Sequence, residues 1–197
     1  MNLNKIDNAN ATSLLIKGEL LLYPTETVYG MGCDATNLQA IQKIFEIKQR
    51  DQGKPLPILV DSLAMLKKYV AEPNAIETKL IERYWPGPLT ILFQSKGVLP
   101  KDIDAGTGKI AARISSHPIA TQLVKELGRP LVSTSANLSE EPSALSPQDL
   151  ARYFSSSNLS YLDGGVLKSS KGSTLVEVVE GRVKIIRQGD LILRHFN

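Results

Sequence analysis

A polar stretch that follows an apolar strand is the part of this chain best suited to bind a ligand. The sequence LVSTSAN at 131–137 places Ser133, Ser135 and Asn137 two residues apart, so their side chains would share one face of an extended segment. Their hydroxyl and amide groups are neutral donors and acceptors of fixed reach. Taken alone, such a segment is usually a turn or a helix cap, but open α/β sheets bind ligands at the carboxyl ends of their strands. We therefore expect a binding site here.

A second stretch supplies positive charge at the same spacing. Lys48 and Arg50, in the sequence IKQRDQGKPL, stand where a helical pattern ends before Pro55. Lysine and arginine bind phosphate oxygens, so two such rows facing one cavity would form a site for a polyanion. The alternative for this pair alone is a solvated helix end, where cations interact favourably with the helix dipole. If Lys48 stands on a groove wall, Lys48→Ala should leave the protein folded, because such a lysine adds little to core packing.

Helical and strand-like segments alternate around these two stretches. Helical patterns cover 7–17, 38–48, 61–70, 75–84, 118–127 and 146–154, with Asp61 as the expected cap of the third. Strand patterns cover 20–23, 56–60, 89–94, 110–114, 131–134, 159–162, 174–179 and 183–187, and the last two would form a hairpin. The segment PTETVYGMG at 24–32 is rich in turn residues, and WPGP at 85–88 must be a loop. This order predicts an α/β fold with one mixed parallel and antiparallel sheet.

Composition limits the classes of function. The chain has 197 residues with 42% hydrophobic content, enough for one buried core, and we expect a single domain over 1–197. Its 23 basic and 20 acidic residues give a net charge of +3, which permits nucleic-acid contact, although dedicated nucleic-acid modules are usually more basic. One cysteine excludes an internal disulfide, and the chain shows neither a secretory signal nor an apolar run of roughly 18 residues. We expect a cytoplasmic protein without membrane contact.

Several motifs together resemble the YrdC/TsaC family. In chain order they are PTETVYGMG at 24–32, KQR at 48–50, WPGPLT at 85–90, ARISSHP at 112–118, STSANLS at 133–139 and RQG at 187–189. The KxR and SxN triplets at this separation are far more specific together than either is alone. The resemblance implies a YrdC-like domain of the short bacterial branch, with a twisted mixed sheet, flanking helices and a concave basic groove.

The family makes threonylcarbamoyl-AMP, so the resemblance implies a nucleotidyltransferase. In this reaction L-threonine, bicarbonate or CO2, and ATP give threonylcarbamoyl-AMP and pyrophosphate, the first step toward t6A in ANN-decoding tRNAs. The resemblance also implies that the product passes to a TsaD-containing transferase complex, with tRNA as a further contact. Because the chain lacks a carboxylate cluster of ligand spacing, Mg²⁺ would arrive with ATP and the protein would supply no metal ligands. A carbamate is a weak nucleophile, so positioning and charge neutralisation should matter more than proton transfer.

The resemblance also implies roles for individual residues. The expected catalytic groups are Lys48, Arg50, Ser135 and Asn137, and these four together with Arg187 are the expected contacts of ATP. The expected contacts of threonine are Thr25, Arg113, Ser133, Ser173 and Thr174. Arg113 would pair with the amino acid's carboxylate, and a structural ion pair is the alternative for this residue.

A competing hypothesis is an RNA-binding factor that acts in tRNA or rRNA maturation without turnover. The same basic groove would then follow a phosphate backbone. Proteins that bind single strands usually carry aromatic residues among their basic ones, and only 6% of this chain is aromatic. This low aromatic content favours the enzyme.

Overall fold

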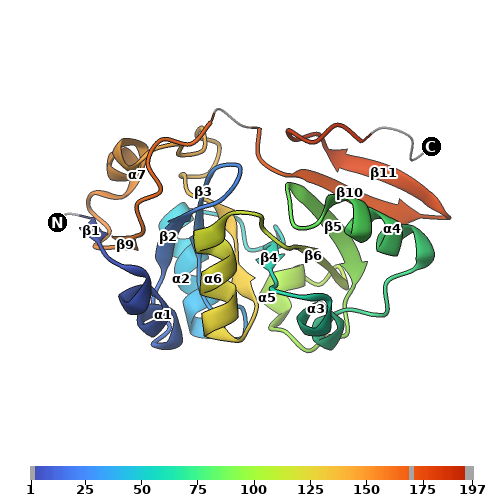
Figure 1. Ribbon diagram of the computed structural model, residues 1–197. Helices are drawn as coiled ribbons and strands as arrows, with labels where there is room; N and C mark the ends of the chain where they lie inside the picture. Colours follow the sequence, from blue (N-terminus) through green and yellow to red (C-terminus); the bar gives the residue numbers. More distant parts are fainter. Residues whose placement is uncertain (1–2, 169–170, 194–197) are drawn as a thin grey trace.

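The strands of the protein form two mixed sheets, shown in Figure 1 for the computed structural model, which describes residues 3–168 and 171–193. The five-stranded sheet contains, in spatial order, β1 (Asn4–Lys5), β9 (Ser160–Tyr161), β2 (Leu21–Pro24), β3 (Tyr29–Gly32) and β8 (Thr134–Ser135). The six-stranded sheet contains, in spatial order, β11 (Arg182–Arg187), β10 (Thr174–Val179), β5 (Leu89–Gln94), β6 (Lys109–Arg113), β4 (Ile58–Leu59) and β7 (Leu131–Val132). Both sheets combine parallel and antiparallel pairs, which confirms the predicted class.

The helices lie on the two sides of the molecule in Figure 1, with α1, α2 and α6 near the five-stranded sheet and α3, α4 and α5 near the six-stranded one. Their bounds are α1 (Asn8–Ile16), α2 (Leu38–Lys48), α3 (Leu63–Tyr69), α4 (Ala75–Tyr84), α5 (Lys101–Asp104), α6 (Pro118–Leu127) and α7 (Pro147–Phe154). No helix of the described residues has the length and apolar character needed to cross a bilayer.

Capping residues explain where several helices begin and end. The side chain of Asn74 accepts hydrogen bonds from backbone N–H groups in the first turn of α4, and the carboxylate of Glu77 accepts one from the backbone N–H of Asn74. Helix α6 starts at Pro118 and stops at Gly128, whose φ of 65° is left-handed. Both helices have the bounds that the sequence predicts. The prediction of Asp61 as the cap of α3 is wrong, because the helix starts one residue later and Ser62 accepts the bond from its first turn.

The predicted strand at 131–134 is divided between the two sheets. Strand β7 pairs with β4 in the six-stranded sheet, whereas β8 pairs with β3 in the five-stranded sheet. Ser133 lies between them, and its backbone N–H donates to the carbonyl oxygen of Pro57 at 2.8 Å. The chain therefore passes from one sheet to the other at Ser133, and the single sheet expected from the sequence is replaced by two.

The turn-rich segment at 24–32 contains a strand that the sequence analysis did not predict. Strand β3 pairs antiparallel with β2, and Gly30 is directly opposite Tyr23. A Cβ atom on Gly32 would come within 2.2 Å of the carbonyl oxygen of Val132, so this position requires glycine. Glycine is a weak strand signal, which is why the pattern of residues did not reveal the strand. The short elements β1 and α5 were likewise not predicted.

We expect Gly32→Ala to lower the free energy of unfolding by about 2 kcal/mol, because an added methyl group must displace the backbone of the neighbouring strand. Gly30→Ala is the matched control, since its Cβ would meet only the ring of Tyr23, at 3.2 Å. Urea denaturation of both variants measures the difference. Equal midpoints would show that the close approach at Gly32 does not constrain the seam between the sheets.

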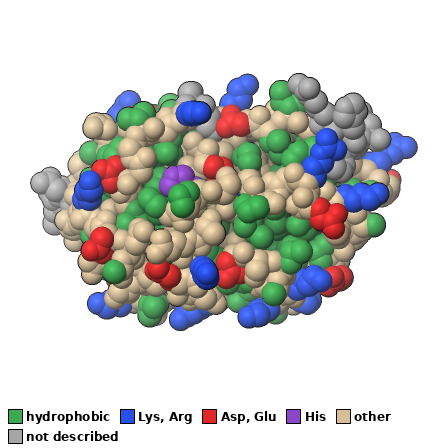
Figure 2. All heavy atoms as spheres, viewed as in Figure 1, with side chains coloured by type: hydrophobic (Ala, Val, Ile, Leu, Met, Phe, Trp, Pro, Cys, Tyr) green, Lys and Arg blue, Asp and Glu red, His purple; other side chains and the backbone are tan. Residues whose placement is uncertain are grey.

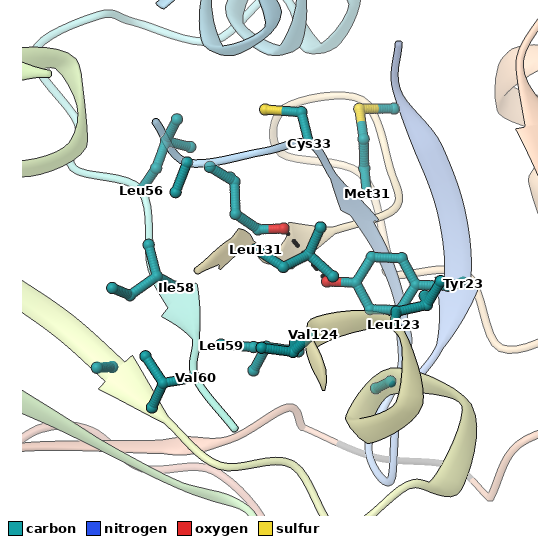
Figure 3. Packing of buried hydrophobic residues seen from close by; sticks show 14 of the residues in the cluster. Tyr23, Met31, Cys33, Leu56, Ile58, Leu59, Val60, Leu123, Val124 and Leu131 are labelled. Atoms are coloured by element: carbon teal, nitrogen blue, oxygen red, sulfur yellow. Dashed lines mark hydrogen bonds between the residues drawn. The ribbon is translucent and has the colours of Figure 1, made fainter. Parts of the chain in front are cut away.

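Side chains from both sheets and from α6 meet in one hydrophobic core. Figure 3 shows part of this core, in which Tyr23, Met31, Cys33, Leu56, Ile58, Leu59, Val60, Leu123, Val124 and Leu131 lie together. The hydroxyl of Tyr23, on β2, donates to the carbonyl oxygen of Val132, on β7, at 3.2 Å. Burial raises the pKa of Tyr23, so its phenol remains a neutral donor. This bond joins the two sheets next to Ser133.

Candidate functional site

A pocket lies where the two sheets meet. Its walls include Thr25, Arg50, Arg113, Ser133, Ser135, Ser173 and Arg187, all of which the sequence analysis named. Several of these residues stand at or just after the carboxyl end of a strand, such as Arg113 on β6 and Arg187 on β11. Strand ends are where open α/β sheets place their ligands. The structure therefore gathers residues that are up to 162 positions apart, from Thr25 to Arg187, around one cavity.

Basic side chains from four segments surround this pocket. Arg50 follows α2, Arg113 ends β6, Lys171 precedes β10 and Arg187 ends β11. Burial lowers the pKa of Arg50, and the Arg187 guanidinium adds to this effect. Burial also lowers the pKa of Arg187, with Arg113 adding to the effect. These positive charges repel one another, and a bound anion would offset the repulsion. The pocket therefore has the electrostatics of an anion site.

Arg50 has spare hydrogen-bonding capacity. One terminal nitrogen donates to the carbonyl oxygen of Pro55 at 2.9 Å. Its Nε is buried and has no hydrogen-bond partner among the described residues. A buried donor without a partner is costly, and a ligand oxygen could bond to it only if the side chain moved, because Nε is enclosed in this structure.

Arg187 is fixed by hydrogen bonds to Ser173, which also lines the pocket. Its guanidinium donates to the carbonyl oxygen of Ser173 at 3.0 Å and to the hydroxyl of the same residue at 3.3 Å. The Ser173 hydroxyl also shares a hydrogen bond with the hydroxyl of Thr90 at 2.8 Å. Thr90 lines the pocket as well, and the sequence analysis did not name it.

Lys48 lies beneath the pocket rather than on its wall. Only 2% of its surface is exposed, and it is not among the pocket-lining residues. Its Nζ donates to the carbonyl oxygens of Ser135 and Asn137, both at 2.6 Å, and to Asn137 Oδ1 at 3.1 Å. The two polar stretches therefore converge, but the expectation of a lysine on a groove wall is wrong. Lys48 is the last residue of α2 and Gln49 is left-handed, so the chain turns and only Arg50 reaches the cavity.

The ammonium of Lys48 fixes the loop that carries the serine and asparagine residues. Burial, together with the Arg50 guanidinium, lowers the pKa of Lys48 to about 7. The three acceptor oxygens around Nζ oppose this shift, because they stabilise the charged form. The side chain of Asn137 is also committed, since Oδ1 accepts from Ser135 at 2.6 Å and Nδ2 donates to the carbonyl oxygen of Glu141. In this structure Lys48 and Asn137 therefore fix the loop that carries Ser135, and neither of them lines the pocket.

The two threonines predicted as ligand contacts have different surroundings. Thr25 lines the pocket, and its hydroxyl donates to the carbonyl oxygen of Val28 at 2.6 Å. Thr174 lies outside the pocket walls and is fully buried. Its hydroxyl donates to the carbonyl oxygen of Leu191 at 2.7 Å and accepts from the Gly189 N–H at 3.0 Å. The geometry gives Thr174 a structural task, holding the segment after β11.

Arg113 forms a structural ion pair, the alternative that the sequence analysis left open, and its contact with a threonine carboxylate stays a prediction. Arg113 lines the pocket, and its partner in the ion pair is Glu26. The second carboxylate oxygen of Glu26 accepts a hydrogen bond from Ser115. Glu26 was not named from the sequence, although it lies within the PTETVYGMG motif.

Other pocket residues were also missed. The polar and charged ones are Thr27, Thr90, Thr134, Ser143 and Lys171. Thr27 and Thr90 fall inside motifs that carry the family resemblance, so their position in those motifs was the available signal. Among the described residues, no group of three or more His, Cys, Asp or Glu side chains is arranged to hold a metal ion.

Known proteins resemble this chain in sequence. A family model named Sua5_yciO_yrdC, with the description "Telomere recombination", matches residues 13–189. A protein named threonylcarbamoyl-AMP synthase from Pyrococcus abyssi is 34% identical over 183 residues, which cover 93% of this chain and 54% of that protein. A protein of the same name from Pseudoalteromonas translucida is 36% identical over 177 residues, which cover 89% of this chain and 95% of that protein.

A solved structure shows the same fold. The structure of Pyrococcus abyssi Sua5 complexed with L-threonine has a TM-score of 0.89 and 32% sequence identity to this protein, covering 96% of this chain and 57% of that one. The chain thus spans about half the length of the Pyrococcus proteins and nearly all of the Pseudoalteromonas protein. Because the family model matches most of the sequence and both sheets have counterparts in the solved fold, this chain belongs to the Sua5/YciO/YrdC family.

Proposed function

We propose that this protein is a threonylcarbamoyl-AMP synthase, which condenses L-threonine, bicarbonate or CO2, and ATP and releases pyrophosphate. The observation that supports this proposal most is the pocket at the seam, where Arg50 and Arg187 face hydroxyl groups and a third arginine, Arg113. Such a pocket suits a ligand with several phosphates beside a small polar molecule with a carboxylate. The names of the relatives from Pyrococcus and Pseudoalteromonas agree with this assignment.

The proposed mechanism relies on positioning and charge. Arg50 and Arg187 bind the phosphate oxygens of ATP and stabilise the negative charge that develops as pyrophosphate leaves. Ser133 donates a hydrogen bond from the loop that Lys48 holds in place, and Ser135 donates to the ligand in exchange for its bond to Asn137 Oδ1. The carbamate oxygen of the carboxylated amino acid attacks the α-phosphorus, and the P–O bond to pyrophosphate breaks. A Mg²⁺ ion carried by ATP would supply further neutralisation of phosphate charge, and it would depend on the nucleotide and water because no group of acidic, histidine or cysteine side chains among the described residues is arranged to hold it.

The proposal extends to the fate of the product. We propose that threonylcarbamoyl-AMP passes to a TsaD-containing transferase complex that forms t6A in ANN-decoding tRNAs, and that both steps take place in the cytoplasm. Direct contact between this protein and tRNA has less support than the synthase activity. In the view of Figure 2, acidic side chains lie among the basic ones, whereas a protein that follows a phosphate backbone usually presents a basic stripe.

A reconstitution experiment tests the activity. Purified protein is incubated with ATP, radiolabelled threonine and bicarbonate, and pyrophosphate release and an adenylated threonyl species are measured. We expect both products only when threonine and bicarbonate are present together. RNA affinity that falls steeply with salt, without any pyrophosphate release, would instead support the RNA-binding hypothesis.

Replacing Arg113 should affect one substrate more than the other. We expect Arg113→Ala to raise the KM for threonine by roughly tenfold or more and the KM for ATP much less, because a charge-assisted bond to the carboxylate is lost. Arg129→Ala is the matched control, since Arg129 pairs with the buried Asp34 and is not on the pocket wall. Steady-state kinetics with each substrate varied in turn make the measurement. Equal increases in both constants for Arg113→Ala would assign this arginine to the nucleotide.

A further inference from the structure

Glu26 is a carboxylate that forms an ion pair with Arg113, an arginine of the pocket wall. Its side chain is 13% exposed, and that of its partner Arg113 is 8% exposed. One carboxylate oxygen accepts from a terminal nitrogen of Arg113, and the other accepts from the hydroxyl of Ser115. Since both oxygens have fixed partners, the carboxylate is locked in one orientation and fixes the plane of the guanidinium beside it.

The other arginines of the pocket have no such partner. Among the ion pairs formed by the described residues, Arg50 and Arg187 take part in none. Arg50 bonds to the backbone at Pro55, and Arg187 bonds to the backbone and hydroxyl of Ser173. Both guanidinium groups therefore keep their full positive charge facing the cavity.

Charge compensation consequently differs among the pocket arginines. Arg50 and Arg187 form no ion pair among the described residues and suit a polyphosphate, although the charge of Asp51 also acts on Arg50. Arg113 is compensated by its ion pair with Glu26. An arginine has five N–H donors, and Glu26 accepts from one nitrogen of Arg113, so donors are left for a single carboxylate. The negative charge of Glu26 also repels phosphate and attracts a substrate ammonium group.

We propose that Glu26 is a positioning residue that separates the two substrates. It orients Arg113 toward a carboxylate and lowers the positive potential beside that arginine, so the polyphosphate binds to Arg50 and Arg187 and the zwitterionic amino acid binds beside Arg113. This inference rests on the proposed function, because the amino acid is one of its substrates. It adds a residue that discriminates between two ligands by charge.

Calorimetric titration of the unliganded protein with L-threonine, and separately with pyrophosphate, tests the proposal without requiring turnover. Glu26→Gln preserves the shape of the side chain and removes its charge. We expect the Kd for threonine to rise roughly tenfold, because Arg113 is no longer held in place. We expect the Kd for pyrophosphate to fall severalfold, because the positive charge of Arg113 is no longer compensated. Pyrophosphate should then also compete with threonine for the variant.

Glu177→Gln is the matched control, because Glu177 is 14% exposed and forms an ion pair with Lys109, which does not line the pocket, whereas Arg113 does. It should change neither Kd. Ser115→Ala frees one oxygen of Glu26 while keeping its charge and its ion pair, so it should raise the Kd for threonine by less than Glu26→Gln does and leave the Kd for pyrophosphate unchanged. If thermal unfolding shows that Glu26→Gln is not folded, this second variant tests whether Glu26 positions Arg113.

Two results would overturn the inference. Unchanged constants, or equal weakening of both ligands, in the folded Glu26→Gln or Ser115→Ala variant would show that Glu26 has only a structural role. A wild-type protein that binds pyrophosphate but not threonine would reject the proposed amino-acid substrate instead. In that case the pyrophosphate measurement still stands alone: tighter binding by the variant supports charge separation by Glu26, and unchanged binding refutes it.

Discussion

Replacing Lys48 with alanine should destabilise the protein and abolish threonine-dependent pyrophosphate release. The side chain is buried, and its Nζ satisfies three acceptor oxygens of Ser135 and Asn137. Lys48→Ala removes the packed aliphatic stem and leaves these oxygens without their donor, so we expect the free energy of unfolding to fall by about 3 kcal/mol. The loop with Ser135 loses its anchor, and turnover should fall by at least about 100-fold.

Lys48→Met separates packing from charge. Methionine keeps most of the buried volume but carries no ammonium, so this variant should lose activity as fully as Lys48→Ala while losing less stability. The pKa of Lys48 is lowered from 10.5 to about 7, so between these pH values the unfolded chain binds a proton that the folded protein does not, and wild-type stability falls as the pH falls through that window. The stability difference between the wild type and Lys48→Met should therefore be smaller at the lower end of the window.

Chemical denaturation at several pH values and a pyrophosphate-release assay provide both measurements. Wild-type stability in Lys48→Ala would mean that the buried bonds contribute nothing. Wild-type turnover in Lys48→Met would show that the ammonium of Lys48 is not needed for the reaction.

Arg50→Ala should have a similarly large effect on activity with little effect on folding. Arg50 lines the pocket, makes one hydrogen bond to the backbone at Pro55, and has an unpartnered Nε. Its removal deprives the phosphates of a charge-assisted donor, so turnover should fall by about 100-fold or more. Stability should change by no more than about 1 kcal/mol, because the lost bond is offset by relief of repulsion from Arg187.

Two further substitutions make this prediction specific. Arg50→Lys retains the charge but not the planar fork of donors, and should recover only part of the activity. Lys54→Ala changes an exposed cation in the same loop and should have wild-type kinetics. Activity in Arg50→Ala equal to that of Lys54→Ala would show that Arg50 does not contact the reacting phosphates.

Much of the fold could be predicted because its signals are local. The bounds of α4, α6 and β5 follow from apolar spacing, from Asn74 as a cap, and from the flanking proline and glycine residues. Strand β3 escaped prediction because its glycines fit against a neighbouring strand and ring, and such a fit depends on residues distant in the sequence.

By itself, the sequence determined the alternation of helices and strands and the identity of most polar residues that line the pocket. The tertiary structure decided how those residues divide their tasks. A two-residue spacing suggested that Lys48 and Arg50 share one wall, yet the left-handed Gln49 directs one beneath the loop and the other into the cavity. The crossing between sheets at Ser133 and the pairing of Glu26 with Arg113 join segments that are 72 to 105 residues apart. Local patterns encode conformation within a few turns of chain, whereas contacts between such distant segments are fixed only when the core packs.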